Sequence, residues 1–136
     1  MQVKEYMSKE LVFANLNDGL HQTFTRMQER GIRHMPVLGE DEKFVGIISD
    51  RDLRRPKWLD ENPNLAKNYR MDNALKVSSA MTQDPIVVHE DDPIKQVIDL
   101  LIDMKYGALP VLDKSEKIVG IISTVDVLKA VRHTLN

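Results

Sequence analysis

The sequence predicts a mixed α/β (α+β) fold built from two copies of one β-α-β-β-α unit, packed with pseudo-twofold symmetry. Residues 36–52 recur as residues 110–126, at an offset of 110 − 36 = 74 with no gap, and 11 of the 17 positions are identical. In each copy, short apolar runs alternate with stretches of helical periodicity, which indicates strands alternating with helices. A unit this small buries little apolar surface by itself, so we expect the two copies to pack on each other.

The offset of 74 holds well outside these two stretches. Val3 matches Val77, and Met7 matches Met81. The chain of 136 residues is therefore expected to consist of repeat 1 at residues 1–55, a linker at 56–76 and repeat 2 at 77–136.

Each repeat opens on a short apolar run, at residues 11–14 and 85–88, bounded by polar residues. Runs of this length are typical of buried strands. Asp18 and Asp92 follow as helix-starting carboxylates. The sequence thus predicts a strand and then a helix at the start of both repeats.

The predicted helices have one apolar face, which is strongest from Ile94 to Ile102 in repeat 2. Gly31 can end the first helix, and Gly107 lies just past the second. Two further strands and a short helix complete each repeat, with a proline near the start of the first of these strands, as an edge or first strand position permits. The strands are expected at 35–38, 43–48, 109–112 and 117–122, and the short helices around Leu53 and Val127–Val131.

The linker departs from this pattern. Pro56 and Pro63 interrupt it, and a helix is possible over residues 65–75. One interpretation is a surface connection held in place by Trp58 and Tyr69. The other is a surface for docking a partner, because loops often carry function.

Composition excludes several classes of protein. The net charge is −2 and the isoelectric point is about 6.1, so no general basic field favours nucleic acid. The chain has no cysteine, which rules out disulfides and thiolate metal sites. The first residues lack the apolar run of a signal peptide, and no stretch approaches the ~20 apolar residues that span a bilayer. We therefore expect a soluble cytoplasmic protein.

The functional argument rests on the heptad Gly-Ile-Ile-Ser-x-x-Asp, which ends each copy at Ser49 to Asp52 and at Ser123 to Asp126. One interpretation is structural: the serine caps a helix, and the aspartate three residues later bonds back to it. The other is a ribonucleotide site. A helix N-terminus favours phosphate, and a carboxylate in the first turn can accept hydrogen bonds from both ribose hydroxyls.

With Pro36-Val37 and Pro110-Val111 upstream, these heptads resemble the CBS domain, named after cystathionine β-synthase, present as the tandem pair called a Bateman module. The resemblance covers nearly the whole chain except residues 56–76. It implies clefts between the two sheets that bind adenosyl ligands such as AMP, ADP, ATP, S-adenosylmethionine or NAD as regulators, with no cofactor required. It also implies that the module regulates a partner and does not catalyse.

The resemblance further implies which residues line each cleft. One cleft would combine the Ser123 motif with residues of repeat 1, namely Ser123, Thr124 and Asp126 with Met7, Val12, Arg33, His34 and Met35. The other would combine the Ser49 motif with residues of repeat 2, namely Ser49, Arg51 and Asp52 with Ile86, Gly107, Ala108 and Leu109.

These two clefts differ in charge. Arg33 and His34 provide a cationic pair suited to a phosphate tail, whereas Gly107 and Ala108 leave room without charge, although Arg51 could substitute. We therefore expect the Asp126 cleft to tolerate more phosphate than the Asp52 cleft. Arg33 and His34 could instead be ordinary surface residues.

The resemblance also implies a homodimer formed through helical faces. The apolar stripe Ile94–Ile102 and the short helices of Leu53 and Leu128 are candidates for that surface. The resemblance implies in addition a protein target that the sequence does not identify. The main alternative is an interaction module with empty clefts, in which both Ser-x-x-Asp motifs are only caps. An enzyme lacks a catalytic set, because no serine has a motif-level partner for a triad. His21, His89 and His133 share no metal-ligand spacing.

Overall fold

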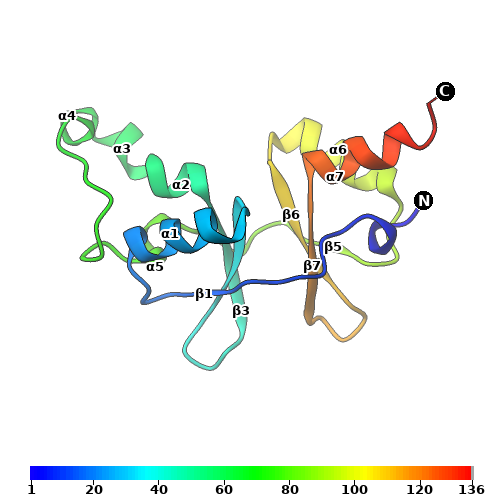
Figure 1. The fold of residues 1–136 in the computed structure, drawn as a ribbon, viewed down its shortest axis with the longest axis horizontal. Helices are drawn as coiled ribbons and strands as arrows, with labels where there is room; N and C mark the ends of the chain where they lie inside the picture. Colours follow the sequence, from blue (N-terminus) through cyan, green and yellow to red (C-terminus); the bar gives the residue numbers. More distant parts are fainter. Residues whose placement is uncertain (136) are drawn as a thin grey trace. The chain divides into compact units, whose positions relative to one another are not determined.

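The computed structural model describes residues 1–135 and divides the chain into two compact units. Unit 1 comprises Met1–Leu11 and the chain from Pro85 onward, and unit 2 comprises Val12–Asp84. Both are layered α/β units in which helices pack on a small sheet (Figure 1).

Unit 2 contains a four-stranded sheet in the order β1-β2-β3-β4. The β1 strand runs parallel to β2, and the other neighbouring strands are antiparallel. Its elements in chain order are β1 (Ala14–Asn15), α1 (Leu20–Arg30), β2 (His34–Leu38), β3 (Phe44–Ser49), α2 (Asp50–Arg54), α3 (Trp58–Glu61), α4 (Pro63–Ala66), α5 (Val77–Ala80) and β4 (Thr82–Gln83).

Unit 1 contains a three-stranded sheet in the order β5-β6-β7, with the same parallel and antiparallel pairings. Both repeats have the predicted order of strand, helix, strand, strand, helix, so the mixed α/β fold class is confirmed. The elements of unit 1 are the 3₁₀ turn η1 (Val3–Glu5), β5 (Val88–His89), α6 (Ile94–Met104), β6 (Ala108–Leu112), β7 (Ile118–Ser123) and α7 (Thr124–Arg132).

The leading segments of the two repeats are exchanged between the units. The Val3 N–H donates to the carbonyl of Asp92 at 2.9 Å, so the start of repeat 1 pairs with the body of repeat 2. The Val77 N–H donates to the carbonyl of Asp18 at 2.9 Å, so the start of repeat 2 pairs with the body of repeat 1. The two contacts are related by the offset of 74. The sequence repeats therefore do not coincide with the compact units, because each unit takes its leading segment from the other repeat.

Two equivalent glycines allow the exchanged segments to approach closely. A Cβ atom on Gly46 of β3 would lie 2.5 Å from the carbonyl oxygen of Thr82. A Cβ atom on Gly120 of β7 would lie 2.6 Å from the sulfur of Met7 and 2.9 Å from the carbonyl oxygen of Ser8. Distances this short leave no room for a side chain, which explains why the heptad begins with glycine in both copies.

Each unit has its own hydrophobic core, to which the exchanged segment contributes. Val3 is fully buried in unit 1, and Val77 is fully buried in unit 2. The core of unit 1 contains Val3, Val88, Ile94, Val97, Leu109, Val111, Ile122, Val127 and Ala130. The core of unit 2 contains Ala14, Leu20, Met27, Met35, Val37, Ile48, Leu53, Val77 and Ala80.

The first strand of each repeat is shorter than expected and lies later in the sequence. The runs at 11–14 and 85–88 were expected to form strands, but ladder pairing is confined to β1 and β5, two residues each. Those residues pair with only the last two residues of β2 and of β6. The parallel ladder is therefore limited to one end of each central strand.

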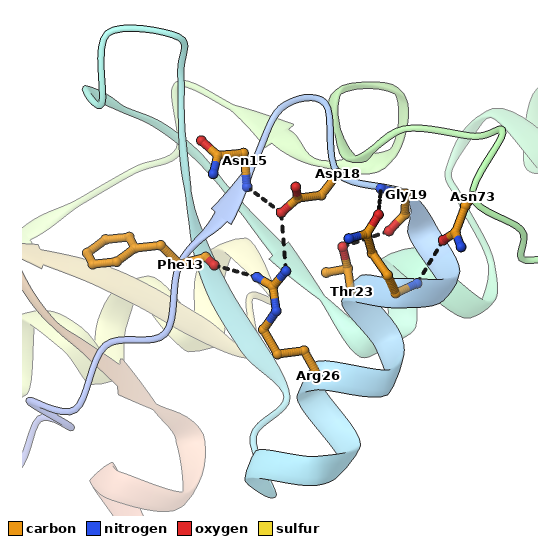
Figure 2. A network of polar contacts seen from close by, with 8 residues as sticks. Phe13, Asn15, Asp18, Gly19, Thr23, Arg26 and Asn73 are labelled. Atoms are coloured by element: carbon orange, nitrogen blue, oxygen red, sulfur yellow. Dashed lines mark hydrogen bonds and ion pairs between the residues drawn. The ribbon is translucent and has the colours of Figure 1, made fainter.

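Asp18 and Asp92 were expected to start the long helices, but the N-caps are the next residues, Gly19 and Pro93, and the aspartates anchor the turns from strand to helix. Figure 2 shows the arrangement in unit 2. Asp18 Oδ2 accepts hydrogen bonds from the backbone N–H of Asn15 at 2.9 Å and from Arg26 Nη2 at 3.5 Å. Arg26 Nη1 also donates to the carbonyl of Phe13 at 2.7 Å. Asp92 makes the equivalent strand contact in unit 1.

The two long helices end in the same left-handed conformation with different residues. Gly31 ends α1 at φ 63°, as predicted. The equivalent residue of α6 is Lys105 at φ 57°, two positions before Gly107. Repeat 2 thus adopts with a lysine a backbone conformation that favours glycine.

The prolines Pro36 and Pro110 lie inside the middle strands β2 and β6, not at their first positions. The ladder between β1 and β2 begins only at Val37. The β2 strand is therefore an edge strand on that side at Pro36, and a residue without an N–H is tolerated there.

The segment 56–76 packs on unit 2 through its aromatic residues. The Trp58 and Tyr69 rings contact each other edge to face, with centroids 5.9 Å apart, and the Tyr69 hydroxyl donates to the carbonyl of Leu53. These contacts agree with the interpretation of an anchored connection. The helix expected over 65–75 does not form, because α4 ends at Ala66.

Among residues 1–135, no helix is long and apolar enough to cross a membrane.

Candidate functional site

Each heptad forms a corner at which a strand gives way directly to a helix. Ser123 ends β7 in an extended conformation and is the N-cap of α7. Its backbone N–H and hydroxyl donate to Asp126 Oδ2 at 2.9 and 3.0 Å, and the Asp126 N–H donates to the serine oxygen at 3.2 Å. Ser49 and Asp52 form the same capping box at the start of α2, with distances of 2.9 and 3.1 Å. The structural interpretation of the motif is therefore correct in both copies.

The capping box leaves part of each carboxylate available. Only the Oδ2 atoms of Asp52 and Asp126 take part in the hydrogen bonds recorded within residues 1–135. An ionised carboxylate has about four acceptor positions, so Oδ1 can accept from a bound hydroxyl. Both side chains are half-buried, which holds them in place while leaving them accessible. Capping and ligand binding are thus compatible uses of the same residue.

The residues that precede each Pro-Val pair lie beside the corner of their own repeat. Ala108 is paired with Ser123 across the ladder between β6 and β7, and the Thr124 N–H donates to the carbonyl of Gly107 at 3.0 Å. In unit 2, His34 is paired with Ser49. The Asp50 N–H donates to the carbonyl of Arg33 at 2.9 Å, which repeats the contact between Thr124 and Gly107.

The residues predicted for each cleft are divided between the two units. Their grouping across the units stays a prediction. Unit 1 contains Met7, Ile86, Gly107, Ala108, Leu109, Ser123, Thr124 and Asp126, and unit 2 contains Val12, Arg33, His34, Met35, Ser49, Arg51 and Asp52.

The predicted cleft residues also differ in how far their side chains are buried. Met35 and Leu109 are at most 1% exposed, and their side chains belong to the two hydrophobic cores. We therefore expect them to contact a ligand only through the backbone. Arg33 and Arg51 are exposed and lie on the same unit as Asp52, whereas the equivalent residues near Asp126 are Gly107 and Val125.

One residue of this region was missed by sequence reasoning. Met7 was predicted to lie near Asp126, and its sulfur does contact β7 beside Gly120. The sulfur of its counterpart Met81 would lie 3.2 Å from a Cβ atom added to Gly46 of β3. The internal repeat could have identified Met81, because Met7 and Met81 are separated by the same 74 positions.

The histidines considered as metal ligands do not come together in one site. Within residues 1–135, no cluster of histidine and carboxylate side chains could hold a metal ion. His89 contacts Glu116 at 3.0 Å, and this hydrogen bond raises the pKa of His89. His133 contacts the Tyr6 hydroxyl at 3.2 Å. Both histidines belong to unit 1, and both contacts lie at its surface.

The candidates for a dimer surface are also sorted by burial. Leu53 is fully buried and Ile94 is 3% exposed, so these two side chains are not themselves exposed, and the use of their helices as a dimer surface stays a prediction. Ile102 and Leu128 are exposed.

Comparison with known proteins agrees with the architecture and the motifs. The model of the CBS domain matches residues 3–56 and 77–133. A CBS domain-containing protein of Dictyostelium discoideum is 33% identical over 130 residues, covering 93% of this chain and 88% of that protein. The uncharacterized protein YlbB of Bacillus subtilis is 29% identical, covering 92% and 78%.

A solved structure has the same fold. The CBS domain pair of protein MJ0100, in complex with 5′-methylthioadenosine and S-adenosyl-L-methionine, superposes with a TM-score of 0.79 at 25% identity, covering 99% of this chain and 98% of that one. The chain therefore belongs to the CBS domain family and contains a tandem pair of CBS domains.

Proposed function

We propose that this chain is a regulatory module that binds an adenosyl ligand and signals to a protein target through a change in conformation. The observation that carries the proposal is the pair of half-buried aspartates. Each is held by a capping box through one carboxylate oxygen, which leaves the other oxygen available to a ligand. The ligands of the similar MJ0100 domain pair support an adenosyl group. A bound ligand would shift the module between states only through its differential affinity for them.

The proposed chemistry follows from the corner geometry. Asp126 accepts hydrogen bonds from the ribose hydroxyls, while the serine and the first turn of α7 fix the carboxylate. Asp52 does the same in the other repeat. Charge-assisted hydrogen bonds of this kind contribute about 1.5–3 kcal/mol each. Loss of the 2′-hydroxyl should therefore weaken binding markedly.

A thermal-shift panel tests the proposal, with AMP, ADP, ATP, NAD, S-adenosylmethionine and 2′-deoxy-AMP as ligands. A ligand at 100 times its dissociation constant adds about 2.7 kcal/mol of stability, which for a chain of this size is a shift of roughly 5–10 °C. We expect a shift with at least one ribonucleotide and a much smaller one with the 2′-deoxy form.

The matched variants are Asp52→Asn and Asp126→Asn. Asparagine retains an oxygen that can accept the capping hydrogen bond but replaces the second acceptor with a donor. Each variant is compared with its own melting temperature without ligand, so that a weakened cap is not mistaken for lost binding. A ligand shift that is unchanged in both variants would contradict a role for the aspartates.

The phosphate preference is tested on the same variants. We propose, as the family resemblance implies, that Arg33 serves the ligand held by Asp126. Arg33→Ala should then reduce ATP binding relative to AMP in the Asp52→Asn background and have no such effect in the Asp126→Asn background. The reverse result would assign Arg33 to the Asp52 corner of its own unit and overturn the expected charge difference.

A second function is favoured by one observation, the completeness of both capping boxes. In that case the clefts are empty, and the chain acts through homodimerisation and protein docking alone. The absence of a shift with any ligand in the panel would support this function and leave the motifs as helix caps. In either case we propose that the chain pairs with a second copy.

A further inference from the structure

One arginine of unit 2 ties its first strand, the following turn and its long helix together. Arg26 belongs to α1, and its Nη1 donates to the carbonyl of Phe13 at 2.7 Å, while its Nη2 contacts Asp18 Oδ2 at 3.5 Å (Figure 2). The same Asp18 oxygen accepts a hydrogen bond from the N–H of Asn15 at 2.9 Å. The guanidinium of Arg26 therefore connects α1 both to the strand and to the turn after it.

The position of this contact makes it an effective restraint on the backbone. The side chains of Arg26 and Asp18 are 30% and 21% exposed, so their interaction is partly shielded from solvent and from screening by salt. Arginine presents its donors in a rigid fork, and a hydrogen bond from a charged donor is stronger than a neutral one. Phe13 lies just before the residues that pair with β2, since the ladder begins at Ala14. Arg26 thus restrains the chain where the first strand begins.

The equivalent residue of unit 1 cannot make this contact. At the offset of 74, Arg26 corresponds to Leu100, whose side chain has no hydrogen-bond donor. Asp92 of unit 1 still accepts a hydrogen bond from the N–H of His89 at 2.8 Å, and it accepts a second one from Gln96 Nε2 at 3.3 Å. Gln96 therefore replaces the contact of the arginine with the aspartate, but Leu100 does not replace its contact with the strand.

The restrained backbone adjoins a residue that is expected to contact a ligand. Val12 precedes Phe13, and its half-buried side chain packs against the core of unit 2. Its counterpart Ile86 packs in the same way against the core of unit 1. Neither side chain has a hydrogen-bonding group, so each residue can offer only its backbone N–H and C=O to the polar edge of a ligand. Backbone groups of this kind fix the orientation of the ligand in many small-molecule sites.

A backbone donor and acceptor can distinguish two purine bases of the same shape. Adenine has an amino donor beside a ring acceptor on its Watson–Crick edge, whereas hypoxanthine has a carbonyl acceptor beside a ring donor. Against a fixed donor and acceptor, the wrong base leaves the polar groups of the site unpaired. A backbone that is free to shift can rearrange its polar groups and therefore rejects the wrong base less strictly.

We propose that Arg26 is a positioning residue that makes the ligand contact at Val12 selective for adenine over hypoxanthine. The contact at Ile86, which has no equivalent restraint, is less selective. The inference rests on the proposed function and adds the selection of the base to it. The two ligand sites of one chain thereby differ in the bases that they accept, independently of the number of phosphates.

Isothermal titration with AMP and IMP tests the proposal, because these nucleotides differ only in the base. The ratio of their dissociation constants therefore cancels the effect of removing a positive charge. The Asp52→Asn background retains the site predicted to include Val12, and there Arg26→Leu should lower the preference for AMP over IMP by about fivefold or more. In the Asp126→Asn background the preference should not change. Equal losses of AMP and IMP affinity, or the same change in both backgrounds, would overturn the proposal.

Gln96→Leu is the matched control for Arg26→Leu. It also removes a side-chain donor to the aspartate of a strand-to-helix turn, but in unit 1, where that donor contacts Asp92. The preference for AMP over IMP should therefore stay unchanged in both backgrounds. A change as large as that of Arg26→Leu would show that loosening either turn is sufficient, and it would overturn the role of the arginine.

Hydrogen exchange without ligand tests the restraint itself. Arg26→Leu should speed the exchange of backbone amides in residues 12–16 more than it speeds exchange in β3, and unchanged exchange in residues 12–16 would overturn the proposal. The titrations separate this inference from the proposed function. If neither nucleotide nor any other adenosyl ligand binds the unaltered chain, the proposed function fails and this inference fails with it. If AMP binds and the ratio is unchanged by Arg26→Leu, this inference alone is overturned.

Discussion

At the scale of single residues, the glycines of the two heptads have different tolerances for a side chain. A Cβ on Gly46 meets the carbonyl oxygen of Thr82 at 2.5 Å, which only a backbone shift can relieve. A Cβ on Gly120 would lie 2.6 Å from the sulfur of Met7 and 2.9 Å from the carbonyl oxygen of Ser8, so its tightest contact is with a flexible side chain and its backbone contact is looser than that of Gly46. We expect Gly46→Ala to destabilise the chain by about 1–3 kcal/mol and Gly120→Ala by less, as measured by urea denaturation. Equal costs, or a larger cost for Gly120→Ala, would contradict this reading of the two contacts.

The helix ends give a second prediction at this scale. Lys105 has a φ of 57°, and its counterpart Gly31 has a φ of 63°. Left-handed backbone costs a residue with a Cβ roughly 1–2 kcal/mol, partly offset by the greater entropy of glycine in the unfolded chain. Lys105→Gly should therefore stabilise the chain by about 0.5–1 kcal/mol.

Gly31→Ala is the matched control for that change. No atom lies within 4 Å of a Cβ added to Gly31, so the substitution reports conformation without a clash. It should destabilise the chain by a similar amount in the same denaturation experiment. A destabilised Lys105→Gly variant would show instead that the lysine side chain makes a contact that matters more than the backbone.

At the scale of secondary structure elements, the repeat predicted most of the fold. The order of strands and helices follows from periodicity within each copy, and the offset of 74 relates every pair of equivalent elements. Local signals were less reliable at element ends. Asp18 was predicted to start a helix, but its carboxylate accepts hydrogen bonds from the N–H of Asn15 and from Arg26, and Gly19 is the N-cap of α1.

The exchange of leading segments could not be predicted from local patterns. Val3 and Val77 occupy equivalent sequence positions, so periodicity alone does not show which repeat each one packs on. The same limit applies to the candidate site. Sequence spacing predicts the capping residues, since a cap is a contact over three residues; these are Ser49, Asp52, Ser123 and Asp126. The ligand contacts contributed by the other repeat depend instead on packing between distant segments, which spacing does not predict.

At the scale of the whole molecule, the exchange of leading segments predicts that a destabilising substitution near the N-terminus weakens the structure of the C-terminal half. Val3 is fully buried among residues of repeat 2, and Val77 is fully buried among residues of repeat 1. Val3→Ala and Val77→Ala should each destabilise the chain, by about 1–3 kcal/mol, through the cavity that remains. Hydrogen exchange measured along the chain should distinguish them. Val3→Ala should lower protection in β5, β6 and β7, and Val77→Ala should lower it in β2 and β3.

These two variants control for each other, because they remove the same atoms from equivalent positions. Loss of protection confined to the repeat that carries the substitution would contradict the exchange. The expected crossed pattern would mean that neither repeat completes its core without the other. Ligand binding at one corner would then influence both halves of the chain through the leading segments, since Ser8 pairs with β7 and Thr82 pairs with β3, the strands that end at the two Ser-x-x-Asp corners.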